Sequence, residues 1–220
     1  MSQKKTIRGR PVDPESQKER KNQLIDAVYD LLHGKSYRDI TIREIAEQAN
    51  TKSAMISYYF GGKQGLFLAM MEREENKRLA SLIGVLKAED PLKAFIYEAI
   101  KNFSEDRAIT RFIADDVMHV DGPLRDKLVN TTPKKIAQFL PSLIIRLQQK
   151  NILRLDIDPK KTAFSLMNMI VMPHISAFVR EQAWGISHEE ISGEDWAEHI
   201  YQLFLTGCQN TKPNEIEDKT

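Results

Sequence analysis

Apolar residues recur at helical spacing along almost the whole chain, and prolines and glycines separate the repeats. Where apolar positions fall three and four residues apart, one face of an α-helix is apolar. Three Asp-Pro pairs, at 13–14, 90–91 and 158–159, place a capping residue before a proline, which is typical of a helix start. We therefore predict an all-α protein. The expected helices cover 14–33, 42–49, 52–59, 63–86, 91–105, 107–119, 132–150, 159–183 and 196–207.

The segment from 41 to 63 carries the most informative local pattern. Thr41 and Glu44 have the spacing of a capping box, in which the hydroxyl accepts a first-turn N–H and the glutamate reaches back to the cap. Asn50 then tolerates the left-handed backbone of a tight turn. The next helix can bury Ile56 and present a small, polar outer face. Two short helices of this kind predict a helix-turn-helix whose second helix fits the major groove of DNA.

This segment resembles the DNA-binding signature of the TetR/AcrR family of repressors over Leu24 to Met70. In that signature a helix-turn-helix ends in an aromatic pair, and a lysine opens the next helix. The matching positions are Thr41, Ile45-Ala46, Ala49, Ile56, Tyr58-Tyr59-Phe60, Lys63 and Leu66. Two positions depart from the pattern, because Asn50 replaces the usual turn glycine and Ser57 replaces a frequent tyrosine. Elsewhere only the length and the helical character agree with the family.

The pattern and the resemblance together assign DNA contacts. Phosphate contacts are expected from Thr41, Tyr59, Lys63 and the N-terminal Arg8 and Arg10. Lys63 opens a helix, where free N–H groups and its own charge would both favour a phosphate. Base edges are expected to face Lys52, Ser53, Ala54, Ser57 and Tyr58. Among these, Lys52 suits a guanine and Ala54 a thymine methyl group.

The distribution of charge supports a polyanionic partner for the first part of the chain only. The net charge is +1, but residues 1–63 carry 12 Lys and Arg against 8 Asp and Glu, and the remainder carries 20 against 23. A basic module attached to a slightly acidic body suits nucleic acid at the basic end. Residues 1–12 contain no acid, and this flexible arm either reaches DNA or only solubilises the chain.

Composition favours a soluble, cytoplasmic protein. Of the 220 residues, 41% are hydrophobic, enough for a sizeable core, and 29% are charged. The single cysteine, Cys208, excludes an internal disulfide and is compatible with a reducing cytosol. No run approaches the ~18 apolar residues of a membrane span. The basic N-terminus has no apolar stretch behind it, so we expect neither a signal peptide nor a membrane partner.

The helices after residue 90 predict a second domain that binds a small molecule. Pro141 should kink the helix over 132–150, and gaps beside kinked helices form pockets. The candidate ligand contacts are Phe103, Arg107, Arg111, Phe112, Asp115, Met118 and His119. The alternative is that the aromatic residues are core and the charges form a solvated face. Asp115 and His119 have the spacing of paired metal ligands, but no third ligand is evident, so we predict no metal and no cofactor.

The last two helices are too apolar for one small domain to cover. The helix over 159–183 is apolar on more than one side, and such a helix must be buried on both. A four-helix bundle with two helices from each chain of a homodimer would cover it. The interface candidates are Phe164, Met167, Val171, His174, Phe178, Trp196, Ile200, Leu203 and Phe204. His174 is expected to be a hydrogen-bonded interface histidine.

The predicted domains are a basic arm (1–12), a three-helix DNA-binding domain (13–62), a larger helical ligand-binding and dimerisation domain (63–209) and a disordered tail (210–220). The catalytic motifs of common enzymes are missing, so we predict no enzyme. The expected function is a ligand-responsive, sequence-specific repressor that binds a palindromic operator in double-stranded DNA as a homodimer. The resemblance implies that a small, partly apolar effector tilts the helix carrying Lys63 and so releases the operator. The alternatives are a non-specific architectural DNA binder without effector, and a helical ligand carrier with a vestigial helix-turn-helix.

Overall fold

The computed structural model describes residues 14–85, 87–119 and 121–210, and gives the backbone alone at 14, 79, 80, 82 and 83. The predicted arm with Arg8 and Arg10, and the tail from 211, lie outside the described residues. Contacts divide the chain into two compact units, Met1–Met71 and Glu72–Thr220. The division falls inside one long helix, α4 (Lys63–Val85).

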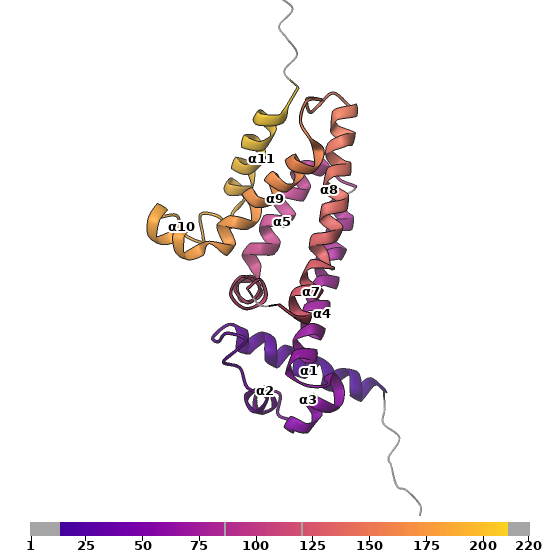
Figure 1. Cartoon of the computed structure of the whole chain (residues 1–220), viewed down its shortest axis with the longest axis vertical. Helices are drawn as coiled ribbons and strands as arrows, with labels where there is room; N and C mark the ends of the chain where they lie inside the picture. Colours follow the sequence, from indigo (N-terminus) through magenta and orange to yellow (C-terminus); the bar gives the residue numbers. More distant parts are fainter. Residues whose placement is uncertain (1–13, 86, 120, 211–220) are drawn as a thin grey trace, which may run out of the picture. The chain divides into compact units, whose positions relative to one another are not determined.

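Unit 1 contains three helices and the beginning of α4 (Figure 1). These are α1 (Pro14–Leu32), α2 (Ile42–Gln48) and α3 (Ser53–Phe60). All three were predicted within a residue or two of their observed ends. The apolar positions that the periodicity selected meet in a small core. Its fully buried members include Leu24, Val28, Leu32, Ile40, Ile45, Ile56, Leu66, Phe67 and Met70.

Unit 2 contains the rest of α4 and eight further helical elements within the described residues. They are α5 (Pro91–Glu105), α6 (Arg107–Phe112), the π-helix η1 (Ile113–Val117), α7 (Pro123–Val129), α8 (Thr132–Gln149), α9 (Pro159–Ile175), α10 (Ala177–Trp184) and α11 (Glu194–Cys208). The two Asp-Pro starts of this unit act as predicted, whereas Asp13 lies outside the described residues. Asp90 accepts from the N–H of Lys93 at 2.9 Å, and Asp158 accepts from that of Lys161 at 2.7 Å.

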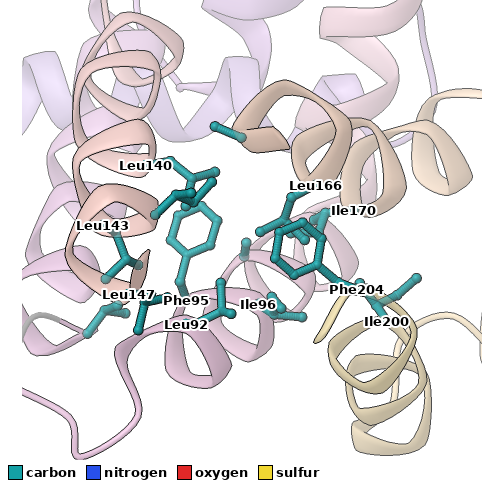
Figure 2. Packing of buried hydrophobic residues seen from close by; sticks show 14 of the residues in the cluster. Leu92, Phe95, Ile96, Leu140, Leu143, Leu147, Leu166, Ile170, Ile200 and Phe204 are labelled. Carbon is teal, nitrogen blue, oxygen red and sulfur yellow. The ribbon is translucent and has the colours of Figure 1, made fainter. Parts of the chain in front are cut away.

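The core of unit 2 lies among α5, α8, α9 and α11 (Figure 2). α5 packs against α9 and α11, and α8 packs against α9. The side chains that meet there include Leu92, Phe95, Ile96, Leu140, Leu143, Leu147, Leu166, Ile170, Ile200 and Phe204. The described residues are therefore all-α, apart from one isolated bridge between Leu153 and Gln209. The predicted fold class is confirmed.

The helix predicted over 159–183 is wrong as a single element. α9 ends at Ile175 and α10 begins at Ala177, with a bend of 77° between them (Figure 1). Pro173 weakens this turn because it lacks an N–H and its ring crowds the carbonyl four residues earlier. The carbonyl of Pro173 accepts from Arg180 Nε at 2.9 Å in place of a main-chain donor. No described helix is by itself long and apolar enough to cross a membrane, and α9 with α10 would meet that test only as a bent pair.

The helix predicted over 107–119 also differs from the structure. α6 stops at Phe112, and the single π turn of η1 follows, closed by the bond from Met118 N–H to the Ile113 carbonyl at 3.0 Å. A π turn inserts one residue and rotates the side chains that follow it. Asp116 and Val117 are consequently buried, whereas Asp115 is exposed. Met118 and His119 lie beyond the helix.

Candidate nucleic-acid interface

The start of α2 is fixed by the predicted capping box. Thr41 N–H donates to Glu44 Oε2 at 2.8 Å, and Glu44 N–H donates to Thr41 Oγ1 at 3.2 Å. Lys35 donates to the same carboxylate. The Lys35 ammonium and the two Thr41 donors lower the pKa of Glu44 to about 2. Thr41 is exposed, so its side chain is accessible at the surface while its backbone N–H is engaged.

The turn between α2 and α3 depends on Asn50. Its φ is 47°, in the left-handed region that the sequence analysis expected. Thr51 N–H donates to the Ala46 carbonyl at 2.9 Å, and Asn50 N–H donates to that of Glu47 at 3.1 Å. These two bonds make a Schellman motif, which satisfies the carbonyls of Ala46 and Glu47 at the end of α2. The direction in which α3 leaves the turn is thereby set by the backbone.

α3 buries one face and presents the other. Ile56 is fully buried, and Gly61 ends the helix in a left-handed conformation with φ 73°. All five residues predicted to face base edges are exposed: Lys52, Ser53, Ala54, Ser57 and Tyr58. Lys52 is the N-cap residue and makes no side-chain cap bond. The exposed face of α3 therefore has the small and polar character that a helix in a major groove requires.

Lys63 is engaged within the protein. Its ammonium donates to the Tyr37 carbonyl and lies 4.3 Å from the centroid of the Tyr37 ring. Tyr37 in turn meets Phe67 edge to face, with ring centroids 4.6 Å apart. The lysine thus ties the loop before α2 to the first turn of α4. Its predicted phosphate contact stays a prediction, and the structure adds this positioning role.

Tyr59 has a neighbour that the sequence did not indicate. Its half-buried ring meets Tyr58 edge to face at 5.0 Å, and Lys21 Nζ from α1 lies 5.8 Å from its centroid. Lys21 is exposed, so it adds a positive charge near the aromatic pair. Nothing in the sequence pattern links residues 21 and 59, because their proximity depends on how α1 crosses α3.

Gly65 is a second residue that sequence reasoning missed. A Cβ at this position would lie 1.8 Å from the carbonyl oxygen of Phe60. Only glycine allows the first turn of α4 to approach the end of α3 so closely. The cluster of glycines at 61, 62 and 65 was the available signal. Gly65 therefore positions α3 through the backbone.

Most of the predicted ligand residues do not line a shared cavity, and Phe103 is partly buried against the core of unit 2. Phe112 is buried in the core, whereas Arg111, Asp115, Met118 and His119 are exposed. Arg107 alone among the candidates lines a surface hollow of about 340 Å³. The other lining residues are Glu181, Gly185, Ile186, Ser187, His188 and Glu189. Among the described residues, no group of three or more His, Cys, Asp or Glu could hold a metal ion.

His174 is not the hydrogen-bonded interface residue that was predicted. It is buried within its own unit, and neither ring nitrogen has a hydrogen-bond partner in the described part of the chain. Its ring stacks on that of Phe103 at 5.7 Å. Burial lowers the pKa of His174 to about 4, with His188 and Arg180 contributing in the same direction. The imidazole is therefore neutral near pH 7.

The structure also separates the predicted interface residues into two sets. Ile200 and Phe204 are 4% exposed and belong to the core of their own unit, so their assignment to a dimer interface is wrong. Met167 and Trp196 are partly buried against the same core. Val171 is half-buried. Phe164, Phe178 and Leu203 are 71%, 80% and 55% exposed and remain uncovered.

Comparison with known proteins gives one family and a shared fold. The sequence model of "Bacterial regulatory proteins, tetR family" matches residues 24–70. The probable HTH-type transcriptional regulator YttP of Bacillus subtilis is 24% identical over 198 residues, covering 85% of this chain and 95% of that protein. The fatty acid degradation regulator FadR of Bacillus halodurans has a TM-score of 0.72 at 15% identity, over 92% of this chain and 100% of that one. FadR of B. subtilis in complex with stearoyl-CoA has a TM-score of 0.70 at 15% identity, over 84% and 98%.

Proposed function

Because this chain belongs to the TetR family of bacterial transcriptional regulators, we propose that it is a repressor that binds a palindromic operator as a homodimer and is released by a small-molecule effector. The family is one of regulators rather than enzymes. The observation that carries the proposal is the exposed face of α3, held between a capping box and a Schellman turn at one end and Gly65 at the other.

Base reading is assigned to the exposed face of α3. Lys52 stands at the N-terminal end of the helix and is exposed, so it can reach a guanine. Ala54 offers a methyl group to a thymine. Tyr58 is 69% exposed and takes the place of the tyrosine that the family often has at 57. These side chains would set the sequence preference.

Phosphate contacts would supply much of the affinity and its salt dependence. Thr41 caps α2 and Tyr59 lies in the last turn of α3, and Lys63 and Lys21 place ammonium groups near the rings of Tyr37 and Tyr59. Arg8 and Arg10 of the basic arm are proposed to add backbone or minor-groove contacts. Such contacts fix orientation on the duplex and carry little sequence information.

The homodimer is proposed to form through the uncovered apolar residues of α9, α10 and α11. Phe164, Phe178 and Leu203 are more than half exposed, together with Trp184 at 75%. Large exposed aromatic groups mark interaction surfaces more often than free surface. Two-fold symmetry of this interface would give two reading heads related by a dyad, and hence a palindromic operator.

The effector would act through α4. This helix begins at Lys63 in unit 1 and ends in unit 2, so a ligand in unit 2 that changes its tilt would change the spacing of the two reading heads. Coupling between sites of this kind is typically ~1–3 kcal/mol, which suffices to release an operator. B. subtilis FadR, whose structure contains stearoyl-CoA, has the same fold at 15% identity.

The DNA-binding proposal is tested with fluorescence anisotropy on a duplex selected from a random pool and on a random duplex. Lys52→Ala should lower affinity for the selected duplex by ~1–3 kcal/mol and leave random DNA almost unaffected. Lys160→Ala, which removes an exposed lysine of α9, is the matched control and should change neither. Equal affinities of the parent protein for both duplexes would support the architectural alternative instead.

The dimer proposal is tested by sedimentation velocity. Phe178→Glu should shift the protein from dimer to monomer, because a charge in a buried interface lacks a partner. Leu155→Glu is the control, since Leu155 is 74% exposed outside the proposed interface. A parent protein that sediments as a monomer would reject the homodimer.

A further inference from the structure

Three buried polar atoms of unit 2 surround Phe103 without a hydrogen-bond partner among the described residues. They are Nη2 of Arg78 and the two ring nitrogens of His174. Buried polar groups in proteins are almost always paired, so three unpaired atoms at one place require an explanation. A ligand that supplies their partners is one such explanation.

The three atoms belong to side chains that share one aromatic ring. The Phe103 ring, on α5, is stacked by His174 from α9 at 5.7 Å with an interplanar angle of 21°. Arg78 from α4 places its guanidinium carbon 5.9 Å from the centroid of the same ring. His174 is only 7% exposed. Two helices, α4 and α9, thus bring unsatisfied polar groups to an aromatic ring on a third helix, α5.

Several other buried or half-buried polar groups of this unit are paired, although Nε1 of Trp196 is also buried without a partner among the described residues. Tyr97 donates to Glu198 at 2.6 Å, and Tyr201 donates to Asp90 at 2.6 Å. The buried Gln148 donates to two carbonyls, each at 3.0 Å. If His174 were only a structural residue of this core, a comparable partner would be expected.

A hollow on the surface of unit 2 lies beside this place, and His188 connects the two. His188 lines the hollow of about 340 Å³ and also meets the His174 ring edge-on at 6.2 Å. His188 therefore stands between the hollow and His174. The volume lies within the range of small-molecule pockets. The charges near the rim cancel. Arg107 offsets the charge of Glu189, and Arg180 pairs with Glu181 at 2.9 Å, so the rim does not repel an anion.

Two of the three unpaired atoms, Nη2 of Arg78 and the N–H nitrogen of His174, are donors and favour a ligand with an acceptor group. A guanidinium is a permanent donor, and a neutral imidazole provides one donor and one acceptor. A carboxylate accepts from both types of donor, and guanidinium–carboxylate bonds are among the strongest in proteins. Phe103 offers an apolar surface to the remainder of the molecule.

We propose that Arg78, Phe103 and His174 form the inner end of a binding site for a carboxylate with an apolar chain, which enters past His188 from the hollow. This ligand is the effector if the proposed function holds, and the binding site itself does not depend on DNA binding. His188 acts as the gate residue, and Arg107 lies at the mouth.

The first experiment measures binding of octanoate by isothermal titration calorimetry, with octanamide as the neutral analogue. The parent protein should bind octanoate at least tenfold more tightly than octanamide, because the amide cannot form the charged pair with Arg78. Arg78→Met and His174→Phe should each weaken octanoate binding about tenfold or more. Arg146→Met, which removes an exposed arginine of α8, should leave the affinity unchanged.

The second measurement separates a ligand site from a structural role. Replacing an unpaired buried polar group by an apolar one of similar shape is nearly neutral or stabilising, so Arg78→Met and His174→Phe should keep or raise the midpoint of urea unfolding without ligand. Destabilised variants would show that both residues support the fold, and would overturn the proposal. Equal affinity for acid and amide, no octanoate binding up to its solubility, or full affinity in both variants would also overturn it. Octanoate binding without any effect on an operator complex would retain the site and reject its role as effector site.

Discussion

Gly65 gives the sharpest test of how the reading helix is positioned. In an exposed helix interior, Gly→Ala ordinarily stabilises a protein by ~0.5–1 kcal/mol, because alanine has less backbone freedom to lose. At position 65 the new Cβ would lie 1.8 Å from the carbonyl oxygen of Phe60. Contacts below 3.0 Å are essentially never found for a Cβ, so the ends of α3 and α4 must separate by at least 1.2 Å.

The obstacle is backbone, which cannot rotate away as a flexible side chain could. The Phe60 carbonyl lies one residue before Gly61, whose N–H closes the last turn of α3 on Ser57 at 3.0 Å. Forced overpacking costs ~1–3 kcal/mol or more. After the propensity gain is subtracted, Gly65→Ala should destabilise unit 1 by roughly 1–2 kcal/mol and displace α3.

Gly84→Ala is the matched control, because Gly84 lies in the same helix and a Cβ there meets nothing within 4 Å. Hydrogen exchange followed by mass spectrometry should show faster exchange in α2 and α3 for Gly65→Ala only. Operator affinity should fall for Gly65→Ala and stay at the parent value for Gly84→Ala. If Gly65→Ala instead raised protection to the same extent as the control, the close approach of α4 to Phe60 would be refuted.

Three further predictions concern other parts of the chain. Lys63→Ala should weaken binding to every duplex and reduce the salt slope by about 0.9, measured by anisotropy over a range of salt concentrations; an unchanged slope would reject its phosphate contact. Asn50→Val should destabilise unit 1 by ~1–2 kcal/mol in urea unfolding because its φ is 47°, whereas Asn50→Gly should be nearly neutral. The pKa of His174 falls from 6.5 to about 4 on folding, so protonation favours the unfolded chain. The contribution of neutral His174 to the free energy of unfolding is therefore complete above pH 6.5 and is lost as the pH falls toward 4. That loss, about 1–3 kcal/mol after allowance for solvent, should disappear in His174→Phe.

Local signals were sufficient for unit 1. The capping box at Thr41 and the left-handed turn at Asn50 both involve residues within five positions of one another, so the sequence displays them directly. The exposed face of α3 follows from the helical spacing of its apolar residues, which is also a local signal. What the sequence could not show was the contact of Lys21 with Tyr59 or of Lys63 with Tyr37, because these depend on how separate helices pack.

The sequence could not separate core residues from interface and ligand residues for a related reason. A stripe of apolar residues on a helix indicates that another element packs against it. It does not indicate whether that element belongs to the same chain or to a partner chain. Ile200 and Phe204 are covered by α5 and α9 of their own unit, whereas Leu203 on the same helix is not. Likewise, Arg78 and His174 lie 96 positions apart, and only the packing of α4 and α9 on Phe103 brings both to one ring.

The bend after Ile175 explains how the site near His174 can exist. A straight helix continued from α9 to Gly185 would carry that residue about 16 Å along the axis from His174, at 1.5 Å per residue. The next three residues would then have to run back almost fully extended to bring His188 near His174. They are not extended, because Ile186 N–H donates to the Arg180 carbonyl at 3.3 Å and Ser187 N–H donates to Glu190 at 2.7 Å. The 77° bend, supported by Arg180 on the Pro173 carbonyl, supplies the return instead. The proline that ended a predicted helix is thus also the residue that allows the His188 gate to reach its place.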